Sequence, residues 1–444
     1  MSTKRGDETM VMGGPTQILV RPKLRLEVVA GPDRGRTAVG EAKVLHIGAQ
    51  DGNTLQLNDD AVSRIHLQIN NTAAGIQLRD LGSTNGTWLP GEIRITEAVV
   101  PPGTVARMGR SHVRIDVLDE QVSESLSSRP GFGEMIGASP AMRAIFAVLE
   151  RVAPTDETIL ITGETGTGKE LCARSIVDRS ARAQGPFVVV DCGAMPPNLL
   201  ESELFGHVRG AFTGATVDHE GAFERANRGT LFLDEIGELP LEFQTRLLRA
   251  VENRSVRRVG GSKEIALDIR ILAATNRCLE EEVNRGTFRA DLYYRLSVVQ
   301  VRIPPLRERP EDVEHLARHL LEELEQGVPQ VLDAEVIERM KRYRWPGNVR
   351  ELRNYIRRLT LGQASGFSPG APERFYRPEG SGSFRLDLSV PFREAKEQAV
   401  ERFERAYLQA LMDRTGGNIS QAAREAQTDR TYLSRLLTKY GIGK

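Results

Sequence analysis

A glycine-rich segment, GETGTGKE at Gly163–Glu170, combines residue types that can hold the phosphates of a nucleotide. It follows an apolar run of strand length and opens a helical stretch, which is the context that a phosphate-binding P-loop requires. Its glycines let backbone N–H groups surround phosphate oxygens, and Lys169 can reach the β- and γ-phosphates. Glu170 occupies the position where a hydroxyl usually helps to hold Mg²⁺. The segment predicts an ATP site formed by Gly163, Glu164, Thr165, Gly166, Thr167, Gly168, Lys169 and Glu170.

Two carboxylates, Asp234 and Glu235, close a second apolar run that reads LFLDE. Carboxylates at the end of a buried strand are costly to desolvate, so their presence there indicates a function. Asp234 is suited to binding Mg²⁺, and Glu235 is suited to orienting and deprotonating an attacking water. Together with the P-loop, the pair predicts hydrolysis of ATP with Mg²⁺ as a cofactor.

Two arginines, Arg289 and Arg295, lie in the segment FRADLYYRL. Phosphoryl transfer needs positive charge on the γ-phosphate in the transition state, so both are candidate arginine fingers. Without the P-loop and the carboxylates, the same arginines would be interpreted as surface residues.

The elements that must position these side chains are indicated by the apolar runs in the middle of the chain. Four runs have the length of buried strands, and helical stretches lie between them, which is typical of an α/β fold with a mainly parallel sheet. We expect strands at Thr158–Thr162, Phe187–Val190, Thr230–Leu233 and Ile269–Ala273, and helices at Glu170–Arg179, Leu241–Glu252, Glu311–Glu325 and Asn348–Leu361.

The flanking blocks have different patterns. Short, partly alternating runs before the α/β block predict a β-sandwich or barrel. After it, residues 418–426 and 429–439 predict two short helices around a tight turn, which is helix-turn-helix geometry. Residues 119–133 are Ser-rich, and Gly, Pro and Ser fill 12 of the 22 positions 362–383, so both stretches are predicted linkers. The expected strands of the first block are Arg25–Ala30, Lys43–Gly48, Thr54–Leu57, His66–Ile69 and Gly75–Asp80.

Length and composition limit the class of protein. At about 150 residues per domain, 444 residues predict about three domains. Lys and Arg total 60 and so do Asp and Glu, so the whole chain is not a polycation and any nucleic-acid contact must be local. We expect no membrane span and no signal peptide, because the apolar runs are too short. Three widely spaced cysteines indicate reduced thiols in a cytoplasm.

The segment GAFTGA at Gly210–Ala215, preceded by ESELFGH, is the most specific motif of the chain. With the P-loop and LFLDE, it makes residues 134–362 resemble the AAA+ domain of bacterial sigma-54-dependent transcriptional activators, the enhancer-binding proteins. The resemblance implies contact with sigma-54, with Phe212 and Thr213 central. An exposed Phe agrees with this, because it is costly unless a partner covers it. The implied contact residues are Gly210, Ala211, Phe212, Thr213, Gly214 and Ala215.

The same resemblance implies further roles. Asn276 matches the sensor I position, and Arg350 in WPGNVREL matches the sensor II arginine. Arg289 and Arg295 match fingers that act on a neighbouring subunit, which implies a ring, usually a hexamer. Asp191 stands where relatives often have Asn, and a carboxylate facing Glu235 would repel it.

The C-terminal helices resemble the Fis-type DNA-binding domain of these activators. Residues 411–444 carry six Lys and Arg against three Asp and Glu, a net charge of +3. A long amphipathic helix at Phe392–Met412 is expected to pair two such tails. The residues predicted to contact the major groove or phosphates are Arg430, Thr431, Ser434, Arg435 and Lys439.

The N-terminal block resembles a forkhead-associated (FHA) domain, on the motifs SRIH at Ser63–His66 and STNGT at Ser83–Thr87. The resemblance implies recognition of phosphothreonine by loops at one end of a sandwich. Ala49 stands where the family usually has an arginine that binds the phosphate. Two interpretations stay open, phosphopeptide binding and a module used for docking or self-inhibition. The implied contact residues are Ser63, Arg64, Thr84 and Asn85.

The sequence therefore predicts three folded domains: an FHA β-sandwich, an α/β P-loop AAA+ domain with an α-helical lid, and an all-α helix-turn-helix domain. The predicted function is ATP-dependent activation of transcription. The tail binds upstream DNA, a ring (dimer to hexamer) remodels sigma-54 RNA polymerase from closed to open complex, and a phosphothreonine protein or Ser/Thr kinase supplies the input. The alternatives are another AAA+ remodelling ATPase and a non-enzymatic phosphopeptide- and DNA-binding adaptor. The predicted boundaries are a tail at 1–18, the FHA domain at 19–118, a linker at 119–133, the AAA+ domain at 134–362, a linker at 363–390 and the Fis-type domain at 391–444.

Overall fold

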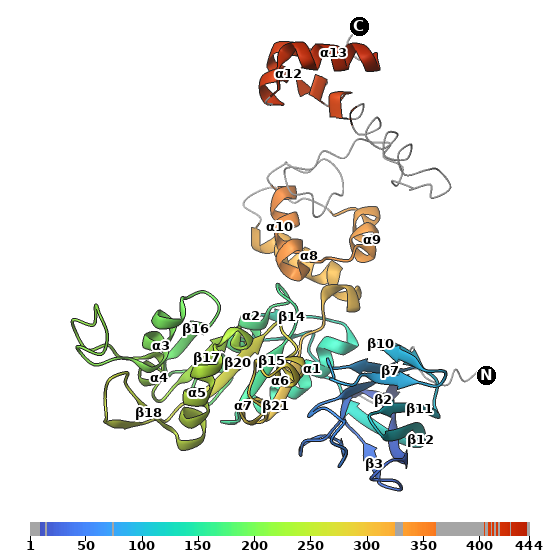
Figure 1. The fold of residues 1–444 in the computed structure, drawn as a ribbon, viewed down its shortest axis with the longest axis vertical. Helices are drawn as coiled ribbons and strands as arrows, with labels where there is room; N and C mark the ends of the chain where they lie inside the picture. The colour runs from blue at the N-terminus through green and yellow to red at the C-terminus, as the bar shows by residue number, and fades with distance from the viewer. Residues whose placement is uncertain are drawn as a thin grey trace. The chain divides into compact units, whose positions relative to one another are not determined.

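The computed structural model describes residues 9–13, 16–72, 75–324, 332–360, 404, 407–409, 411–412, 414–415, 418–426 and 428–441. The chain forms two compact units, Met1–Gly370 and Ala371–Lys444 (Figure 1). The first eight residues of the predicted tail, the predicted linker at 363–390 and the turn residue Gln427 lie outside the described residues, as does most of the helix predicted at Phe392–Met412.

The N-terminal part of the first unit is a β-sandwich, as predicted. Alternate residues of its strands point into one apolar core; on β7, for example, Ile76 and Leu78 are buried and their neighbours are not. One sheet has the order β1-β2-β12-β11-β8-β9, with β3 paired to β2, and the other has the order β10-β7-β6-β4-β5. The strands are β1 (Thr9–Gly13), β2 (Thr16–Ala30), β3 (Thr37–Gly40), β4 (Val44–Gly48), β5 (Leu55–Gln56), β6 (Leu67–Thr72), β7 (Gly75–Asp80), β8 (Thr87–Leu89), β9 (Ile93–Ile95), β10 (Glu97–Val100), β11 (Thr104–Met108) and β12 (Ser111–Ser125).

Strand β12 extends into the segment predicted as a linker at 119–133. It stays paired with β2 as far as Ser125, opposite Ile18, after an irregularity between Val117 and Gln121. The extension is possible because β2 is itself long enough to supply hydrogen-bonding partners. A separate short strand, β13 (Gly131–Phe132), also lies within the predicted linker.

The middle of the unit is a parallel five-stranded sheet in the order β16-β17-β20-β15-β21. Successive residues of the buried strands enter two different cores: on β17, Leu231 and Leu233 pack on one face and Phe232 packs on the other. This two-sided burial explains the continuous apolar runs of the sequence. The strands are β15 (Ile159–Thr162), β16 (Phe187–Asp191), β17 (Thr230–Asp234), β20 (Arg270–Thr275) and β21 (Val299–Arg302), and the hairpins are β13–β14 (Gly131–Phe132, Met135–Ile136) and β18–β19 (Ser255–Arg257, Glu264–Ala266).

Helices cover both faces of this sheet. Helices α1 and α2 pack on the face that holds Phe232, and α3, α5, α6 and α7 contribute to the core on the opposite face. The elements are α1 (Pro140–Val152), α2 (Lys169–Asp178), α3 (Pro197–Phe205), α4 (Ala222–Arg225), α5 (Leu241–Asn253), α6 (Leu279–Arg285) and α7 (Ala290–Leu296), with short 3₁₀ turns η1 (Ile236–Glu238) and η2 (Leu306–Glu308).

Three further helices, α8 (Glu311–Leu324), α9 (Ala334–Arg342) and α10 (Asn348–Thr360), form a small bundle that corresponds to the predicted lid (Figure 1). Trp345 is fully buried at its centre, between the rings of Tyr343 and Tyr355, and its Nε1 donates to Met340 O (2.8 Å). The buried carboxylate of Asp312 accepts from Ala138 N (2.6 Å) and Ser139 N (2.7 Å), so it ties the bundle to the start of α1.

The second unit contains α12 (Ile419–Glu425) and α13 (Arg430–Tyr440), as predicted. Each helix starts at a side-chain cap: Asn418 accepts from Ser420 N and Gln421 N, and Asp429 accepts from Thr431 N and Tyr432 N. The two helices pack through an apolar core. Among the described residues of both units, no helix is long and apolar enough to cross a membrane.

Candidate functional site

The P-loop lies between β15 and α2. Gly168 is the N-cap of α2 with φ 104°, a conformation that glycine adopts readily. The side chain of Lys169 is only 7 % exposed, and its Nζ donates to Gly163 O (3.1 Å) and lies 3.4 Å from Glu235 Oε1. The lysine is therefore held at the mouth of the loop by groups that a phosphate could replace. Glu170 points outward, toward Arg174.

Asp234 and Glu235 lie directly beside this lysine, at the carboxyl end of β17. Desolvation raises the pKa of Asp234 above its ordinary value, and the Glu235 charge adds to this, while the Glu235 N–H and Lys169 oppose it. A half-buried carboxylate with a raised pKa is a suitable partner for a cation. Glu235 has the left-handed conformation φ 49°, ψ 47°, and its Oε2 accepts from Asn276 N (3.1 Å).

Asn276, the predicted sensor I residue, joins the two motifs. It follows β20, and its Nδ2 donates to Thr165 Oγ1 of the P-loop (3.0 Å) while its backbone holds Glu235. One residue thus contacts both the phosphate loop and the candidate base. Strands β15, β17 and β20 are adjacent in the sheet, which explains why residues far apart in the sequence meet here.

Asp191, expected to repel Glu235, lies at the end of β16. It is paired in register with Asp234, and its own Oδ1 accepts from Gly193 N (2.9 Å). Its charge is one of the contributions that raise the pKa of Asp234. Asp191 and Asp234 therefore interact electrostatically at this edge of the sheet.

The backbone of the lid contacts the P-loop directly. The carbonyl of Gly166 accepts from Val349 N (3.0 Å) and Arg350 N (3.3 Å), at the start of α10. A Cβ at position 166 would lie 2.4 Å from Gly347 O, so this close approach requires glycine. Arg350, the predicted sensor II residue, is exposed next to the loop.

Two lid residues that were not predicted as part of the site also contact the P-loop. Arg307 donates to both carboxylate oxygens of Glu164 (2.7 and 2.5 Å), and this pairing lowers the pKa of Glu164. Asn348 is fully buried, and its Nδ2 donates to Glu164 Oε2 (3.2 Å) and Thr165 O (3.1 Å). The Gly-Asn step before a helical run was the available signal, because Asn tolerates the positive φ of 53° found there.

The two candidate fingers lie elsewhere on the domain. Arg289 precedes α7, and its guanidinium forms two hydrogen bonds with Asp291 (3.0 and 2.6 Å). Arg295 is exposed on α7. Within the described part of the chain, no contact joins either guanidinium to the P-loop.

The GAFTGA segment forms an exposed loop after α3. Gly210 N donates to Ala215 O (2.8 Å), which closes the loop, and both Gly210 and Gly214 have positive φ with open space around them. The Phe212 side chain is 43 % exposed and touches the His207 ring edge to face (centroids 4.9 Å apart). Ala211, Phe212 and Thr213 therefore form the tip of the loop, and Ala215 is buried at its base.

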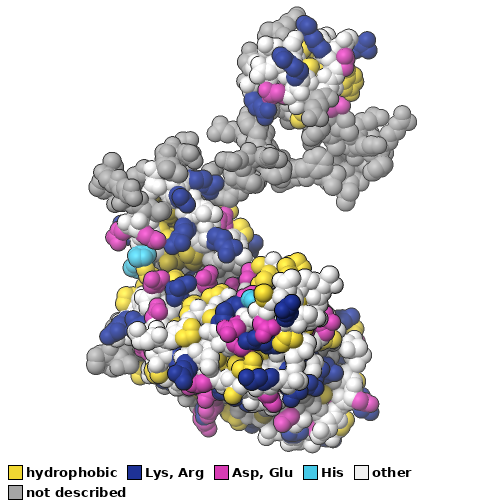
Figure 2. All heavy atoms as spheres, turned by 90° about the vertical axis from the view of Figure 1, so that its left-hand side faces the viewer, with side chains coloured by type: hydrophobic (Ala, Val, Ile, Leu, Met, Phe, Trp, Pro, Cys, Tyr) yellow, Lys and Arg dark blue, Asp and Glu magenta, His cyan; other side chains and the backbone are white. Residues whose placement is uncertain are grey.

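The hairpin β18–β19 supports this loop from the side. Val208 N donates to Val259 O (3.1 Å), and Val259 N donates to Gly206 O (2.9 Å). Figure 2 shows this side of the unit, where hydrophobic side chains alternate with charged ones. Backbone hydrogen bonds thus hold the base of the loop, while its apolar tip is exposed.

Comparison with known proteins identifies the architecture. Residues 135–302 match the sigma-54 interaction domain, residues 307–367 the AAA+ ATPase lid domain and residues 399–440 the bacterial regulatory protein, Fis family. The regulatory protein AtoC of Escherichia coli is 42 % identical over 324 residues, which cover 72 % of this chain and 70 % of that protein. The chain belongs to the family of sigma-54-dependent activators.

Other members of the family align with smaller parts of the chain. The transcriptional regulator NtrC of Azospirillum brasilense is 56 % identical over 227 residues, 51 % of this chain and 47 % of that protein. The chain thus spans about half the length of the first curated relatives it matches. The structure of NtrX from Brucella abortus in complex with ATP is 37 % identical, covers 71 % of each chain and has a TM-score of 0.50.

The N-terminal sandwich of this family member matches a different model over residues 27–117, the cytoplasmic domain of an inner-membrane component of the type III secretion system. An FHA domain studied for phosphothreonine-dependent interactions is 28 % identical and covers 22 % of this chain and 99 % of that chain, with a TM-score of 0.20.

The four residues predicted to bind phosphothreonine lie together at one end of the sandwich. Ser63 Oγ accepts from Thr84 N (3.1 Å), and Asn85 Nδ2 donates to Ala61 O (2.7 Å). Arg64, Thr84 and Asn85 are exposed. Trp88 is half-buried beside them, and its Nε1 donates to Asn85 O (3.0 Å).

On the second unit, the residues predicted to contact DNA share the exposed surface of α13. Its opposite face is closed by Leu433 and Leu437. Lys439 also lies near Glu404 (3.9 Å) and donates to Tyr440 Oη (2.7 Å). Figure 2 shows Lys and Arg side chains on the visible face of this unit. The exposed residues are Arg430, Thr431, Ser434, Arg435 and Lys439.

Proposed function

We propose that this chain activates transcription by binding upstream DNA and using ATP hydrolysis to remodel sigma-54 RNA polymerase from closed to open complex. The observation that carries the proposal is the presence, in one domain, of a P-loop lysine held beside the Asp234–Glu235 pair and of an exposed GAFTGA tip with Phe212 at its surface. The ATP-bound structure of NtrX supports ATP as the nucleotide.

In the proposed hydrolysis, a water attacks the γ-phosphorus of ATP, the bond to ADP breaks and Glu235 accepts the proton from the water. Lys169 exchanges its contacts with Gly163 O and Glu235 for the phosphates, and Asn276 keeps Glu235 in position. Asp234 would hold Mg²⁺ together with phosphate oxygens and water, an arrangement that this ion favours. When bound, the ion neutralises charge that develops on the phosphates.

Arg289 and Arg295 complete the site only from a neighbouring subunit. They lie away from the P-loop of their own chain, so the proposed ATPase is a ring of identical chains, up to a hexamer.

On the second unit, Thr431, Ser434 and Arg435 are proposed to read the major groove, with Arg430 and Lys439 nearer phosphates. A single short helix reads too small a site, so we propose that two tails act together.

The first test uses the full chain, sigma-54 RNA polymerase and a supercoiled promoter with upstream sites. We expect open complex, measured by permanganate footprinting, only when hydrolysable ATP is present. A non-hydrolysable analogue is the control. Equal amounts of open complex in both reactions would refute the proposal, and ATP turnover without any effect on the polymerase would favour another AAA+ remodelling machine.

For the sandwich, we propose a phosphothreonine ligand at Ser63, Arg64, Thr84 and Asn85. Support comes from their clustering at one loop end, where Arg64, Thr84 and Asn85 are exposed. The full chain should bind phosphothreonine peptides more tightly than matched threonine peptides, and Ser63→Ala should remove that preference, because charge-assisted contacts to phosphate are strong. Fluorescence anisotropy measures both. Equal binding of the two peptides would show that the loop end has another use.

A further inference from the structure

The loop end of the sandwich contacts the AAA+ domain, at helix α6. The Asn284 side chain donates to Ile65 O (2.6 Å) and Leu81 O (2.8 Å), and its Oδ1 lies 3.4 Å from Ile65 N. A single amide of α6 therefore satisfies backbone groups of two sandwich loops, which adjoin the predicted ligand residues Arg64 and Thr84.

The same contact has an apolar component. Ile65 and Leu81, 2 % and 0 % exposed, pack into the core of the AAA+ domain that includes Leu279 and Val283 of α6. These two side chains lie on loops at the end of the sandwich, outside its own core. Away from α6 they would be exposed to solvent, so the loop end has the character of a surface built for a partner.

Charged groups fix the orientation of the contact. Arg79 Nη2 lies 2.6 Å from Glu281 Oε1, and the Glu281 side chain is only 19 % exposed. Arg64 Nη1 donates to Val283 O (3.4 Å). One of the predicted phosphate ligands is therefore already engaged by a carbonyl of α6.

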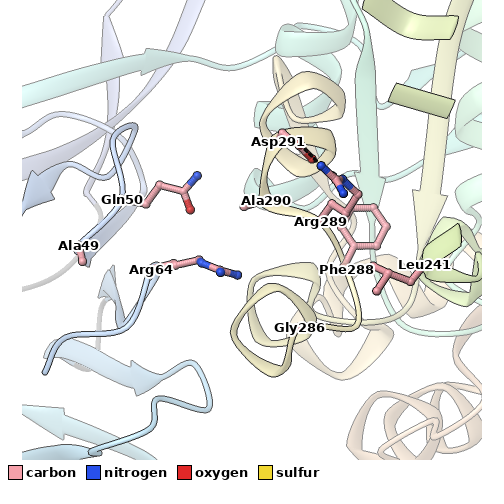
Figure 3. Close-up of a pocket in the computed structure, with 9 residues that line it drawn as sticks. All are labelled: Ala49, Gln50, Arg64, Leu241, Gly286, Phe288, Arg289, Ala290 and Asp291. Atoms are coloured by element: carbon pink, nitrogen blue, oxygen red, sulfur yellow. Dashed lines mark hydrogen bonds and ion pairs between the residues drawn. The ribbon is translucent and has the colours of Figure 1, made fainter. Parts of the chain in front are cut away.

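Beyond this contact, an open pocket of about 650 Å³ separates the sandwich from the candidate finger. Figure 3 shows Ala49, Gln50 and Arg64 on one side of it, and Phe288 and Arg289 on the other. Arg289 lines this pocket, and its side chain is 40 % exposed. The docked sandwich thus forms one wall of the space in front of the candidate finger.

We infer that α6 is an internal ligand of the sandwich's loop end, and that docking restrains ATP hydrolysis by shielding Arg289 from the next subunit. The inference rests on the proposed action of Arg289 in trans. The internal ligand is α6 itself, Leu279–Arg285. An external ligand that binds Arg64 would therefore compete with docking of the sandwich on α6.

The experiment reverses the charges of one ion pair in the full chain. Arg79→Glu and Glu281→Arg should each speed hydrogen exchange across residues 279–285. Each should also raise ATP turnover at a fixed low protein concentration by about fivefold, the shift that one partly exposed ion pair can produce. The double variant Arg79→Glu/Glu281→Arg should restore low turnover, because it restores the pair between the sandwich and α6; it does not restore the pair of Glu281 with Arg285 inside α6. Lys23→Glu, which breaks the pairs with Glu41 and Glu120 on the same sandwich, is the matched control and should change neither.

The outcomes separate this inference from the proposed function. Unchanged exchange in the single variants, or faster exchange with unchanged or lower turnover, overturns the inference and leaves the ATPase proposal standing. Failure of the double variant to recover low turnover overturns it as well, since the effects of the single variants on turnover would then not come from the Arg79–Glu281 pair. Absence of ATP turnover in every form at every concentration overturns the proposed function, and the inference with it.

Discussion

Replacing Glu235 with glutamine should abolish ATP turnover and leave ATP binding intact. The carboxamide can still accept from Asn276 N but cannot take the proton of the attacking water, and general-base catalysis contributes about 10²–10⁴-fold to rate. Phosphate release measures turnover, and binding of a fluorescent ATP analogue measures affinity. We expect at least a 100-fold loss of turnover (~10²) with affinity changed by less than about threefold.

The control for this variant is Glu238→Gln, three residues further on. The Glu238 carboxylate pairs with Arg277 (2.5 Å) and has no role in the proposed hydrolysis. It should keep normal turnover. If Glu235→Gln turned over ATP like the unaltered chain, another group would have to be the base. If the unaltered chain bound ATP but never hydrolysed it, the adaptor interpretation would be favoured.

Replacing Phe212 with alanine should uncouple ATP hydrolysis from open-complex formation. The ring is 43 % exposed at the tip of its loop and contacts His207, so its loss should disturb neither the nucleotide site nor the core. If Phe212 is a central anchor for sigma-54, its truncation should weaken that contact by about 30-fold or more, as at other interface hot spots. ATP turnover and open complex should be measured on the same preparation.

Val217→Ala is the matched control, because Val217 is an apolar residue five positions along the chain and is 66 % exposed. It should retain both activities. Loss of open complex in both variants would point to the loop as a whole, not to the Phe212 ring. Normal open complex with Phe212→Ala would remove this residue from the sigma-54 contact.

The nucleotide site could be predicted because its residues belong to two short motifs at the ends of buried strands. Continuous apolar runs marked β15, β17 and β20, and the carboxyl ends of parallel strands meet at one edge of a sheet. The pairing of Glu164 with Arg307 could not be predicted, because the two residues lie far apart in the sequence. No local pattern specifies that contact, which depends on how the lid folds back onto the P-loop.

The sandwich also has contacts that the sequence pattern could not predict. Alternation of apolar residues predicted its strands, but no pattern indicated that Ile65 and Leu81 are buried against the AAA+ domain, outside the sandwich core. The Ser-rich composition suggested a linker from residue 119, while β12 continues because a long partner strand is available. Both differences arise from tertiary contacts.

The two tryptophans of the chain lie in different parts of it, so their fluorescence can report on each part separately. Trp345 is sealed inside the lid bundle, and Trp88 is half-buried beside Asn85 at the loop end of the sandwich. Buried indoles emit at shorter wavelength than solvated ones, so we expect Trp345 to emit at shorter wavelength than the half-buried Trp88. A Trp88→Phe chain would emit from the lid alone and a Trp345→Phe chain from the sandwich alone. Nucleotide binding and the state of the loop end could thus be followed separately, in real time, without attaching a dye.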